Sequence, residues 1–208
     1  GIYLETVEIS NQNLTIRNAV WDEEEVIIDG QETGSVVTFS ASEGFNLHLE
    51  NINIMGGYAE NGGGIHIDGV PHVYLLNTNI NHNTAAQSGG GLYTNGAFIY
   101  LENVVFENNS CLSDVGGGAV VLFNVHSNPI FKNCLFKSNT ATNGSGGAVN
   151  VVESNFEFIE CTFKDNIASK GGAIAVETTP GSESVIKKSS FYENIANWGG
   201  AVHTKDSE

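Results

Sequence analysis

The chain has 208 residues, including 25 glycines and three prolines, and 24 acidic residues against eight basic ones give a net charge of −16 at pH 7. This composition, with 40% hydrophobic residues, excludes collagen-like and disordered classes and is typical of a turn-rich all-β protein. The charge excludes nucleic acid as a partner, because a phosphate backbone requires lysine and arginine to replace its counterions. No run of eighteen apolar residues occurs, so we expect no membrane insertion of this segment.

The first part of the chain, residues 1–46, contains short apolar stretches without a regular repeat. Terminal repeats of a solenoid are often atypical, because one of their faces meets solvent or a neighbouring element. We therefore interpret residues 1–46 as the first coil and a half of a solenoid, and the acidic residues 22–25 as a solvated loop. The strands predicted there span residues 7–9, 14–16, 26–28 and 35–39.

From residue 47 to residue 208 the sequence repeats a Gly-Gly-(Gly/Ala)-aliphatic block at intervals of 25 to 29 residues. A Phe-x-x-Asn motif precedes most of these blocks, as in Phe163 to Asn166. A small residue such as Ala168 lies two positions after the asparagine of the motif. Self-similarity with this period is typical of a solenoid. The blocks begin at Gly62, Gly89, Gly117, Gly146, Gly171 and Gly199.

Each copy of the repeat predicts three short strands, which in one copy span residues 92–94, 98–101 and 104–106. Inward-facing residues alternate within each strand, but Leu101 and Val104 are three positions apart, so the chain bends between them. Asparagine tolerates the left-handed backbone of such a bend, and stacked asparagines can hydrogen-bond to one another. The glycine block serves a second corner. The predicted bend residues are Asn51, Asn77, Asn103, Asn133, Glu160 and Lys188.

Three strands cannot bury a core alone, but successive copies stacked on one another can. We predict an all-β, right-handed parallel β-helix solenoid of about seven coils with three parallel sheets. Residues 1–208 form a single domain, with atypical first coils in 1–46 and regular repeats in 47–208, and we expect it to be a fragment of a longer chain. Two inward ladders are predicted: Ile65, Leu92, Val120, Val149, Ile174 and Val202; and Ile54, Ile80, Phe106, Phe136, Phe163 and Phe191.

Three cysteines are too few for a disulfide framework in a chain of this length. Cys134 and Cys161 occupy the same position of successive repeats, so their Cα atoms would be about 4.8 Å apart, within the range of a disulfide. The alternative, which we favour, is that both are buried thiols that act as small hydrophobic residues. Cys111 replaces the small alanine of the repeat.

The chemistry of an enzyme is hard to assemble from these residues. A lyase requires a base and a cation that holds the substrate carboxylate, yet Arg17 is the single arginine. A hydrolase requires two close carboxylates, whereas Asp68 and Glu177 would lie four coils apart, about 19 Å. His66 and His203 share an outward position but not a coil, and the histidines lack metal-ligand spacing. We assign no catalytic, cofactor or metal residue, and calcium at acidic turns stays open as an alternative.

Two connections after the first strand of a coil are longer than the others, residues 123–129 and 177–184. Variable loops on a rigid scaffold are the usual location of binding sites. They lie two coils apart, about 10 Å, which is close enough to form one patch. The candidate binding residues are Phe123, Asn124, His126, Asn128, Glu177, Thr178, Thr179 and Glu183.

The pairing of Phe-x-x-Asn with Gly-Gly-Ala-(Ile/Val/Leu), over residues 54–204, resembles the repeat of chlamydial polymorphic outer-membrane proteins. The opening stretch, GIYLETVEISNQNLTI, is similar to large secreted β-helix proteins of environmental bacteria. The resemblance implies an extracellular or cell-surface β-helix with an adhesive role, and it carries over no site residue.

We therefore expect a non-catalytic secreted or cell-surface module, adhesin-like or structural. Its expected partners are a surface glycan or protein and other domains of the same longer chain. The alternative is a carbohydrate-active β-helix enzyme, a polysaccharide lyase or hydrolase, which shares the fold. A groove lined by clustered carboxylates and a lysine would favour the enzyme, whereas flat faces with exposed loop tips would favour the module.

Overall fold

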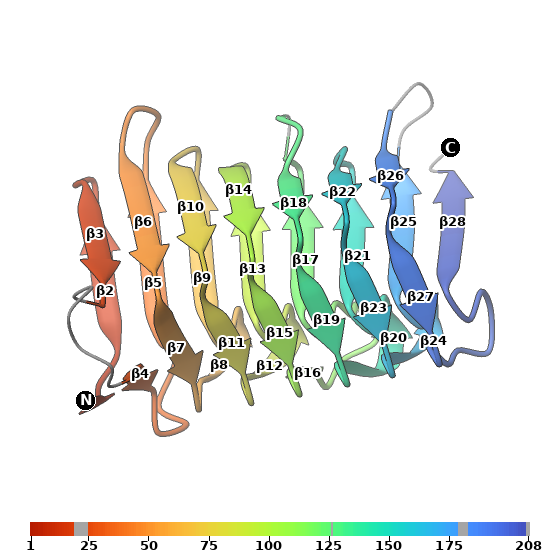
Figure 1. Cartoon of the computed structure of the whole chain (residues 1–208), viewed down its shortest axis with the longest axis horizontal. Coiled ribbons are helices and arrows are strands. Elements are labelled where there is room, and N and C mark those ends of the chain that lie inside the picture. The colour runs from red at the N-terminus through yellow and green to blue at the C-terminus, as the bar shows by residue number, and fades with distance from the viewer. Residues whose placement is uncertain (19–24, 126, 179–182, 207–208) are drawn as a thin grey trace.

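The computed structural model describes residues 1–18, 25–125, 127–178 and 183–206. These residues form strands that stack into a parallel β-solenoid of about seven turns, as predicted. Figure 1 shows the coils side by side, with the first and last strands at opposite ends of the stack. Across the described ranges there is no helix that is long and apolar enough to cross a membrane.

Sheet 1 contains the strand that follows each glycine block, and sheet 2 contains the next strand of each coil. Neighbouring strands in both sheets are parallel and in register. The strands of sheet 1 are β2 (Val7–Ser10), β5 (Val37–Ala41), β9 (Ile65–Gly69), β13 (Leu92–Asn95), β17 (Val120–Phe123), β21 (Val149–Val152), β25 (Ile174–Thr178) and β28 (Val202–Asp206). Those of sheet 2 are β3 (Leu14–Arg17), β6 (Asn46–Glu50), β10 (His72–Leu76), β14 (Phe98–Glu102), β18 (Ile130–Lys132), β22 (Glu157–Ile159) and β26 (Val185–Lys187).

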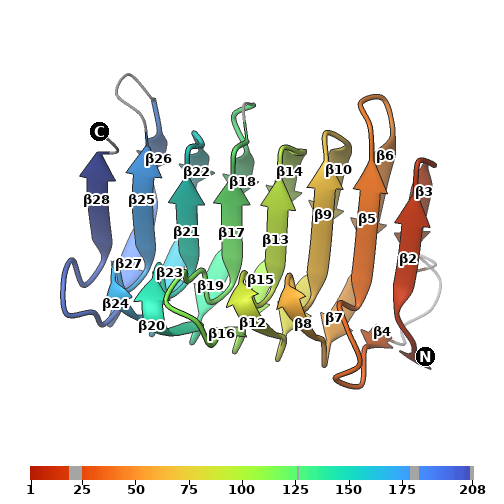
Figure 2. The ribbon, with the colours of Figure 1, turned by 180° about the vertical axis from the view of Figure 1, so that it is seen from behind.

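Sheet 3 carries the Phe-x-x-Asn motif, and the shorter sheet 4 lies between that motif and the glycine block, as Figure 2 shows from behind. The strands of sheet 3 are β1 (Ile2–Leu4), β4 (Val26–Asp29), β7 (Ile52–Met55), β11 (Asn79–Asn81), β15 (Val105–Glu107), β19 (Leu135–Lys137), β23 (Thr162–Lys164) and β27 (Ser190–Tyr192). Those of sheet 4 are β8 (Tyr58–Asn61), β12 (Thr84–Ser88), β16 (Ser110–Cys111), β20 (Thr140–Ser145) and β24 (Ile167–Lys170).

The prediction of three sheets was wrong, because the structure has four. The small residues between the motif and the glycine block, which we did not assign to a strand, pair between coils: Ala85 with Cys111, and Cys111 with Ala141. Their side chains are fully buried, and their small size brings the backbone close to the core in an extended conformation. The corner before the glycine block is therefore partly sheet.

The bend between sheets 2 and 3 follows the prediction closely. Asn103 has φ of 55°, and its side-chain amide donates a hydrogen bond to Oδ1 of Asn77 at 2.9 Å. The Nδ2 of Asn133 donates in turn to Oδ1 of Asn103 at 2.6 Å. At the last two bends, Glu160 and Lys188 keep the left-handed backbone and form an ion pair of 3.1 Å instead. Polar ladders thus follow the outer edge of this corner.

The interior contains the predicted ladders of apolar side chains. Phe136 stacks on Phe106 with 5.0 Å between the ring centroids, and Phe163 stacks on Phe136 at 4.7 Å and on Phe191 at 4.8 Å. The planes of adjacent rings differ by at most 4°. Phe106, Phe136 and Phe163 are fully buried, so this ladder forms the centre of the core.

The asparagines of the Phe-x-x-Asn motifs form a second polar ladder, which the sequence analysis did not identify; all are buried except Asn194 of the last copy, which is partly buried. The Nδ2 of Asn109 donates to the carbonyl oxygen of Ile80 at 2.8 Å and to Oδ1 of Asn139 at 3.1 Å. The backbone N–H of Asn109 donates to the same Oδ1 at 3.0 Å. Each buried amide therefore has protein partners for its donor and its acceptor, which explains why the repeat carries asparagine there.

The three cysteines are buried free thiols. Cys134 and Cys161 lie at equivalent positions of adjacent coils, where the backbone N–H of Thr162 donates to the carbonyl oxygen of Cys134 at 2.9 Å. Burial raises the pKa of the Cys134 thiol well above its ordinary value. The buried-thiol interpretation agrees with this arrangement.

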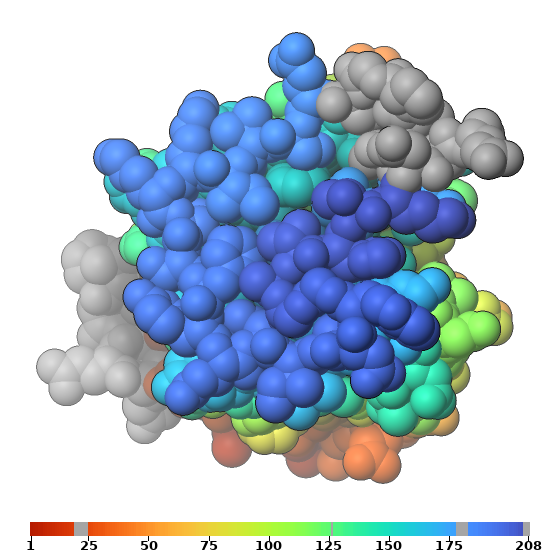
Figure 3. Space-filling model, turned by 90° about the vertical axis from the view of Figure 1, so that its right-hand side faces the viewer, coloured from red at the N-terminus to blue at the C-terminus, as the bar shows by residue number. Residues whose placement is uncertain are grey.

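The first coils also follow the prediction. Strands β2, β3, β4 and β5 coincide with the four strands predicted within residues 1–46, although β5 begins at Val37 rather than at residue 35. Residues 22–24 of the predicted acidic loop lie outside the described residues, and the carboxylate of Glu25 accepts a hydrogen bond from Nδ2 of Asn53 at 3.0 Å. Figure 3 shows the opposite end of the stack, where the last coil forms the visible face.

Candidate functional site

A groove with a volume of about 530 Å³ lies on the outer face of sheet 1. Its floor contains Tyr93, Val121 and Asn150, which are paired neighbours on β13, β17 and β21. Its wall is formed by residues at the ends of the sheet 4 strands, including Ser145 and Lys170. The glycine corners turn the chain sharply between the two sheets, so the wall stands directly beside the floor.

The longest corner loop, residues 112–115, raises this wall. The Oγ of Ser113 donates to the carbonyl oxygen of Gln87 at 2.6 Å, in the preceding coil. Asn150, in the following coil, donates from its Nδ2 to the carbonyl oxygen of Val115 at 3.0 Å. The loop is therefore attached to both neighbouring coils, and it carries Asp114 to the edge of the groove.

Charged side chains line the C-terminal half of the groove. Lys170 and Glu177 contribute both to the groove and to a smaller recess beside it, which also contains His203 and Lys205. The Nζ of Lys205 lies 2.9 Å from Oε1 of Glu177. The Nζ of Lys170 lies 5.9 Å from the centroid of the Trp198 ring. This end can therefore present lysine ammonium groups and a carboxylate to a ligand, and the ring of Trp198 lies beside Lys170.

The N-terminal half of the groove is more neutral. Tyr93 stacks at a tilt on His66 with 5.2 Å between ring centroids. Burial, and then the negative charge of Asp68, raises the pKa of the Tyr93 hydroxyl above its ordinary value, so this hydroxyl is a hydrogen-bond donor at neutral pH.

The predicted binding loops contribute to this groove only at their bases. Phe123 and Glu177 both line it, and Val152 joins them as the intervening residue of the same row of sheet 1. Asn128, at the other end of the first loop, lines a different pocket on sheet 2. The bases of the two loops therefore lie in one row of the groove and Asn128 lies on another face, and binding by any of these residues stays a prediction.

Of the remaining predicted residues, Asn124 and Glu183 are not among those that line the groove. Asn124 adopts φ of 52° at the start of the first loop, Thr178 is the last residue of β25, and Glu183 is exposed. His126 and Thr179 lie outside the described residues.

The sequence analysis missed Asp114, Asn150 and Lys170. One signal was available, because the outward row of sheet 1 contains Val121 and Ala175 between polar residues. These two side chains are 2% and 3% exposed, which shows that the outward row is covered by the wall. Small apolar residues in an outward row of a sheet therefore indicate that a neighbouring wall covers that row.

Asp68 and Glu177 lie four strands apart in sheet 1, as predicted.

Among the described residues, no three histidine, cysteine, aspartate or glutamate side chains are grouped in a way that could hold a metal ion. The acidic residues of the groove, Asp114 and Glu177, are accompanied by lysine instead. The donors and acceptors of the groove therefore suit hydrogen bonding and ion pairing with an organic ligand.

The four sheets and their inward ladders define the class of the protein as a parallel β-solenoid. Within it, residues 160–177 match the model of the Chlamydia polymorphic membrane protein repeat. This segment runs from the bend at Glu160 through β23 and β24 to Glu177 in the groove, and the other coils repeat its geometry. No curated protein and no solved structure matches the chain significantly.

Proposed function

We propose that the chain is a non-catalytic cell-surface or secreted β-helix module that binds a surface glycan or protein through the groove on sheet 1. The matched repeat, named for chlamydial membrane proteins, supports a surface location. The groove carries the proposal, because it extends along the stack from Tyr93 on β13 to Glu177 on β25. A ligand lying along it would contact several coils at once, which suits an extended polymer.

The residues of the repeat support a scaffold rather than a reaction centre. The phenylalanine ladder, the buried asparagine ladder and the glycine corners account structurally for the repeated residues. Binding groups therefore come from positions that vary between coils, such as Asp114, Asn150 and Lys170. An adhesive module requires only this combination of a rigid solenoid and a variable face.

The proposal is tested by shortening both loops, residues 123–129 and 177–184, to the length of residues 95–97. The chain is first applied to a panel of immobilised surface glycans and extracellular proteins to identify a ligand. We expect the shortened chain to keep its circular dichroism spectrum and melting temperature but to lose binding, and Lys188→Ala, on the opposite edge, to bind normally. Retained binding by the folded, shortened chain would exclude the loop bases, and retained binding by a folded chain with both Asp114→Ala and Lys170→Ala as well would contradict the groove as the site.

A carbohydrate-active enzyme is the second candidate, because Asp114, Lys170 and Glu177 line one groove. This is the combination of carboxylates and a lysine that favours an enzyme. Against it, Glu177 is paired with Lys205, and the Asp114 loop precedes β17, two strands before β25. Release of reducing or unsaturated sugar from uronate polymers, with or without calcium, and its loss in Lys170→Ala, would establish the enzyme and overturn the module.

A further inference from the structure

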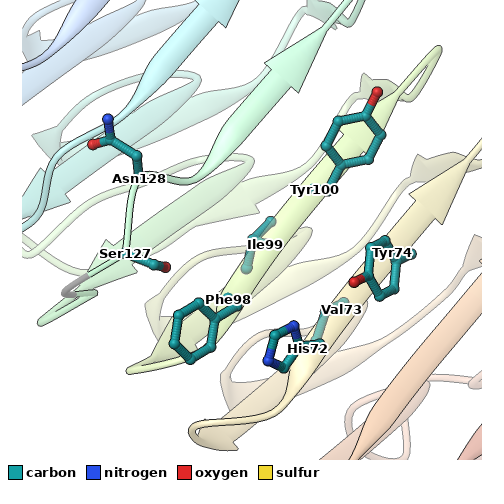
Figure 4. Close-up of a pocket in the computed structure, with 8 residues that line it drawn as sticks. All are labelled: His72, Val73, Tyr74, Phe98, Ile99, Tyr100, Ser127 and Asn128. Atoms are coloured by element: carbon teal, nitrogen blue, oxygen red, sulfur yellow. The ribbon is translucent and has the colours of Figure 1, made fainter.

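A second recess, separate from the groove, lies on the outer face of sheet 2. It has a volume of about 100 Å³ and is bordered by β10, β14 and the end of the loop before β18. Figure 4 shows the rings of His72 and Phe98 side by side at one end of it, and Tyr74 with Tyr100 at the other. Ser127 and Asn128 approach from the loop.

The floor of this recess is aromatic. The rings of His72 and Phe98 are stacked, with 4.6 Å between their centroids and 14° between their planes. Tyr74 and Tyr100 are paired neighbours in the same two strands. Tyr74 and Phe98 are each 37% exposed, so both present aromatic surface that the core does not use. Both rings are therefore available to contact a ligand.

The rim of the recess is polar. The Oγ of Ser127 is buried and has no hydrogen-bond partner among the described residues. Figure 4 shows this hydroxyl directed from the loop toward β14, and Asn128, the next residue of the loop, also lines the recess. A buried hydroxyl without a partner is unfavourable, so a ligand that supplies one gains from the contact. The hydroxyl of Tyr100, in contrast, already donates to Oε2 of Glu102 at 2.7 Å.

We propose that this recess binds one neutral pyranose ring, such as the terminal sugar of a glycan. The apolar C–H face of the sugar would lie on Phe98 and Tyr74, and its hydroxyls would exchange hydrogen bonds with Ser127 and Asn128. The combination of an apolar floor and a few fixed polar groups is that of a small-molecule site. The size of the recess favours a single ring over a polymer.

The charge of the ligand follows from the surroundings. No lysine or arginine is among the described residues that line the recess. Lys132, on the neighbouring strand β18, is already paired with Glu102 at 2.7 Å. The chain has a net charge of −16, so it would repel the carboxylate of a uronate or a sialic acid, and no cation of the recess lining would hold that carboxylate.

The test uses methyl β-glucoside, methyl β-galactoside and methyl α-mannoside as neutral probes and methyl β-glucuronide as the charged match. Binding is measured by saturation-transfer NMR and by chemical-shift changes of the His72 and Phe98 rings. We expect at least one neutral glycoside to bind the wild-type chain. Phe98→Ala should weaken that binding about tenfold, since loss of a stacked ring removes roughly 1.4 kcal/mol at the upper end of aromatic pair energies.

Four variants separate the recess from general surface effects. Phe98→Tyr should keep binding because it keeps the ring, and Ser127→Ala should weaken it severalfold. Tyr192→Ala, which removes an exposed ring from sheet 3, should bind like the wild type. Lys170→Ala, in the groove, should also bind normally, so the recess and the groove can fail independently. The proposal is overturned if no neutral glycoside binds, if the glucuronide binds equally well, or if folded Phe98→Ala binds unchanged.

Discussion

The side chain of Asn139 and its own backbone N–H both donate to a single atom, Oδ1 of Asn166, each at 3.0 Å. The same side chain also donates to the carbonyl oxygen of Phe106 at 3.0 Å, while its Oδ1 accepts from Asn109. One asparagine therefore connects three successive coils. Both residues of the central pair are fully buried, so these bonds form away from water.

The first prediction concerns this ladder. Asn139→Ala removes the acceptor for the backbone N–H and the side-chain amide of Asn109, both of which stay buried. Each unsatisfied group costs about 1–3 kcal/mol, so the free energy of unfolding should fall strongly in urea denaturation. Asn81→Ala removes an outward hydrogen bond of 2.6 Å to Asn53, where water can replace it, and should cost much less. Equal losses in the two variants would contradict the ladder.

The second prediction concerns the core. Phe163→Ala should lower the free energy of unfolding by about 3–5 kcal/mol, because the rings of Phe136 and Phe191 are held by their own coils and cannot fill the gap. Lys164→Ala is the matched control, since its ammonium makes long surface ion pairs of 3.8 Å with Asp165 and Glu193. Unfolding midpoints that coincide would show that the ladder is not the centre of the core.

The third prediction concerns the middle glycine of the corner, which is restricted by close contact with the next coil rather than by its backbone conformation. Gly171, the first glycine of its block, has φ of 60°, but Gly172 does not have a positive φ. A Cβ atom at Gly172 would instead overlap the carbonyl oxygen of Gly200 in the next coil. We expect Gly172→Val to prevent stable folding, and Ala173→Gly to cost about 1 kcal/mol. A Gly172→Val chain that melts like the wild type would show that the coils are farther apart than described.

The fourth prediction concerns acid titration. The hydrogen bond from the Lys132 ammonium, followed by that from the Tyr100 hydroxyl, lowers the pKa of the Glu102 carboxyl below its ordinary value of 4.5. A lowered folded-state pKa means that the contribution to stability is present above the unfolded-state value and is lost as pH falls through the folded-state pKa. The group is exposed, so the contribution to stability is small.

Carboxyl-carbon NMR measures this shift directly. Lys132→Met should raise the pKa of Glu102 toward its ordinary value, and Tyr100→Phe should raise it by a smaller amount. Lys188→Met, which removes a cation paired with Glu160 instead, should leave the Glu102 titration unchanged. An unaltered Glu102 midpoint in Lys132→Met would rule out the pair in solution.

The fifth prediction concerns the thiols. Because all three cysteines are buried, and burial raises the pKa of Cys134, a thiol reagent at pH 8 should label the native chain very slowly. Ser184→Cys, at an exposed position, should be labelled at once. After denaturation without reductant, three equivalents should react with the wild-type chain. One equivalent would instead indicate a disulfide between Cys134 and Cys161.

The sequence predicted most of the fold, because solenoid coils place equivalent residues in contact. Alignment of the repeats was enough to place Phe163 on Phe136 and Asn103 on Asn77. Sheet 4 escaped this reasoning, because strands as short as Ser110–Cys111 are too brief to show alternation. Their pairing depends on the neighbouring coils rather than on their own sequence.

The groove was less predictable than the fold. The wall of the groove depends on the orientation of the loop that carries Asp114. The hydrogen bond that holds this loop, from Asn150 to Val115, joins residues 35 positions apart. Sequence repeats reveal what the coils share, whereas this loop is a departure from the repeat. The loop bases at Phe123 and Glu177 were found because they departed from it in length.

The direction of the sheet hydrogen bonds has a mechanical consequence. Bonds between coils, such as that from the N–H of Ser190 to the carbonyl oxygen of Cys161 at 2.9 Å, run along the stack, and the first and last strands lie at its opposite ends (Figure 1). Tension applied between those ends therefore peels the outermost coil first, while the inner coils remain intact. Each detached coil would add more than twenty residues of extended chain. The module would therefore lengthen in steps under an applied force before it unfolded completely.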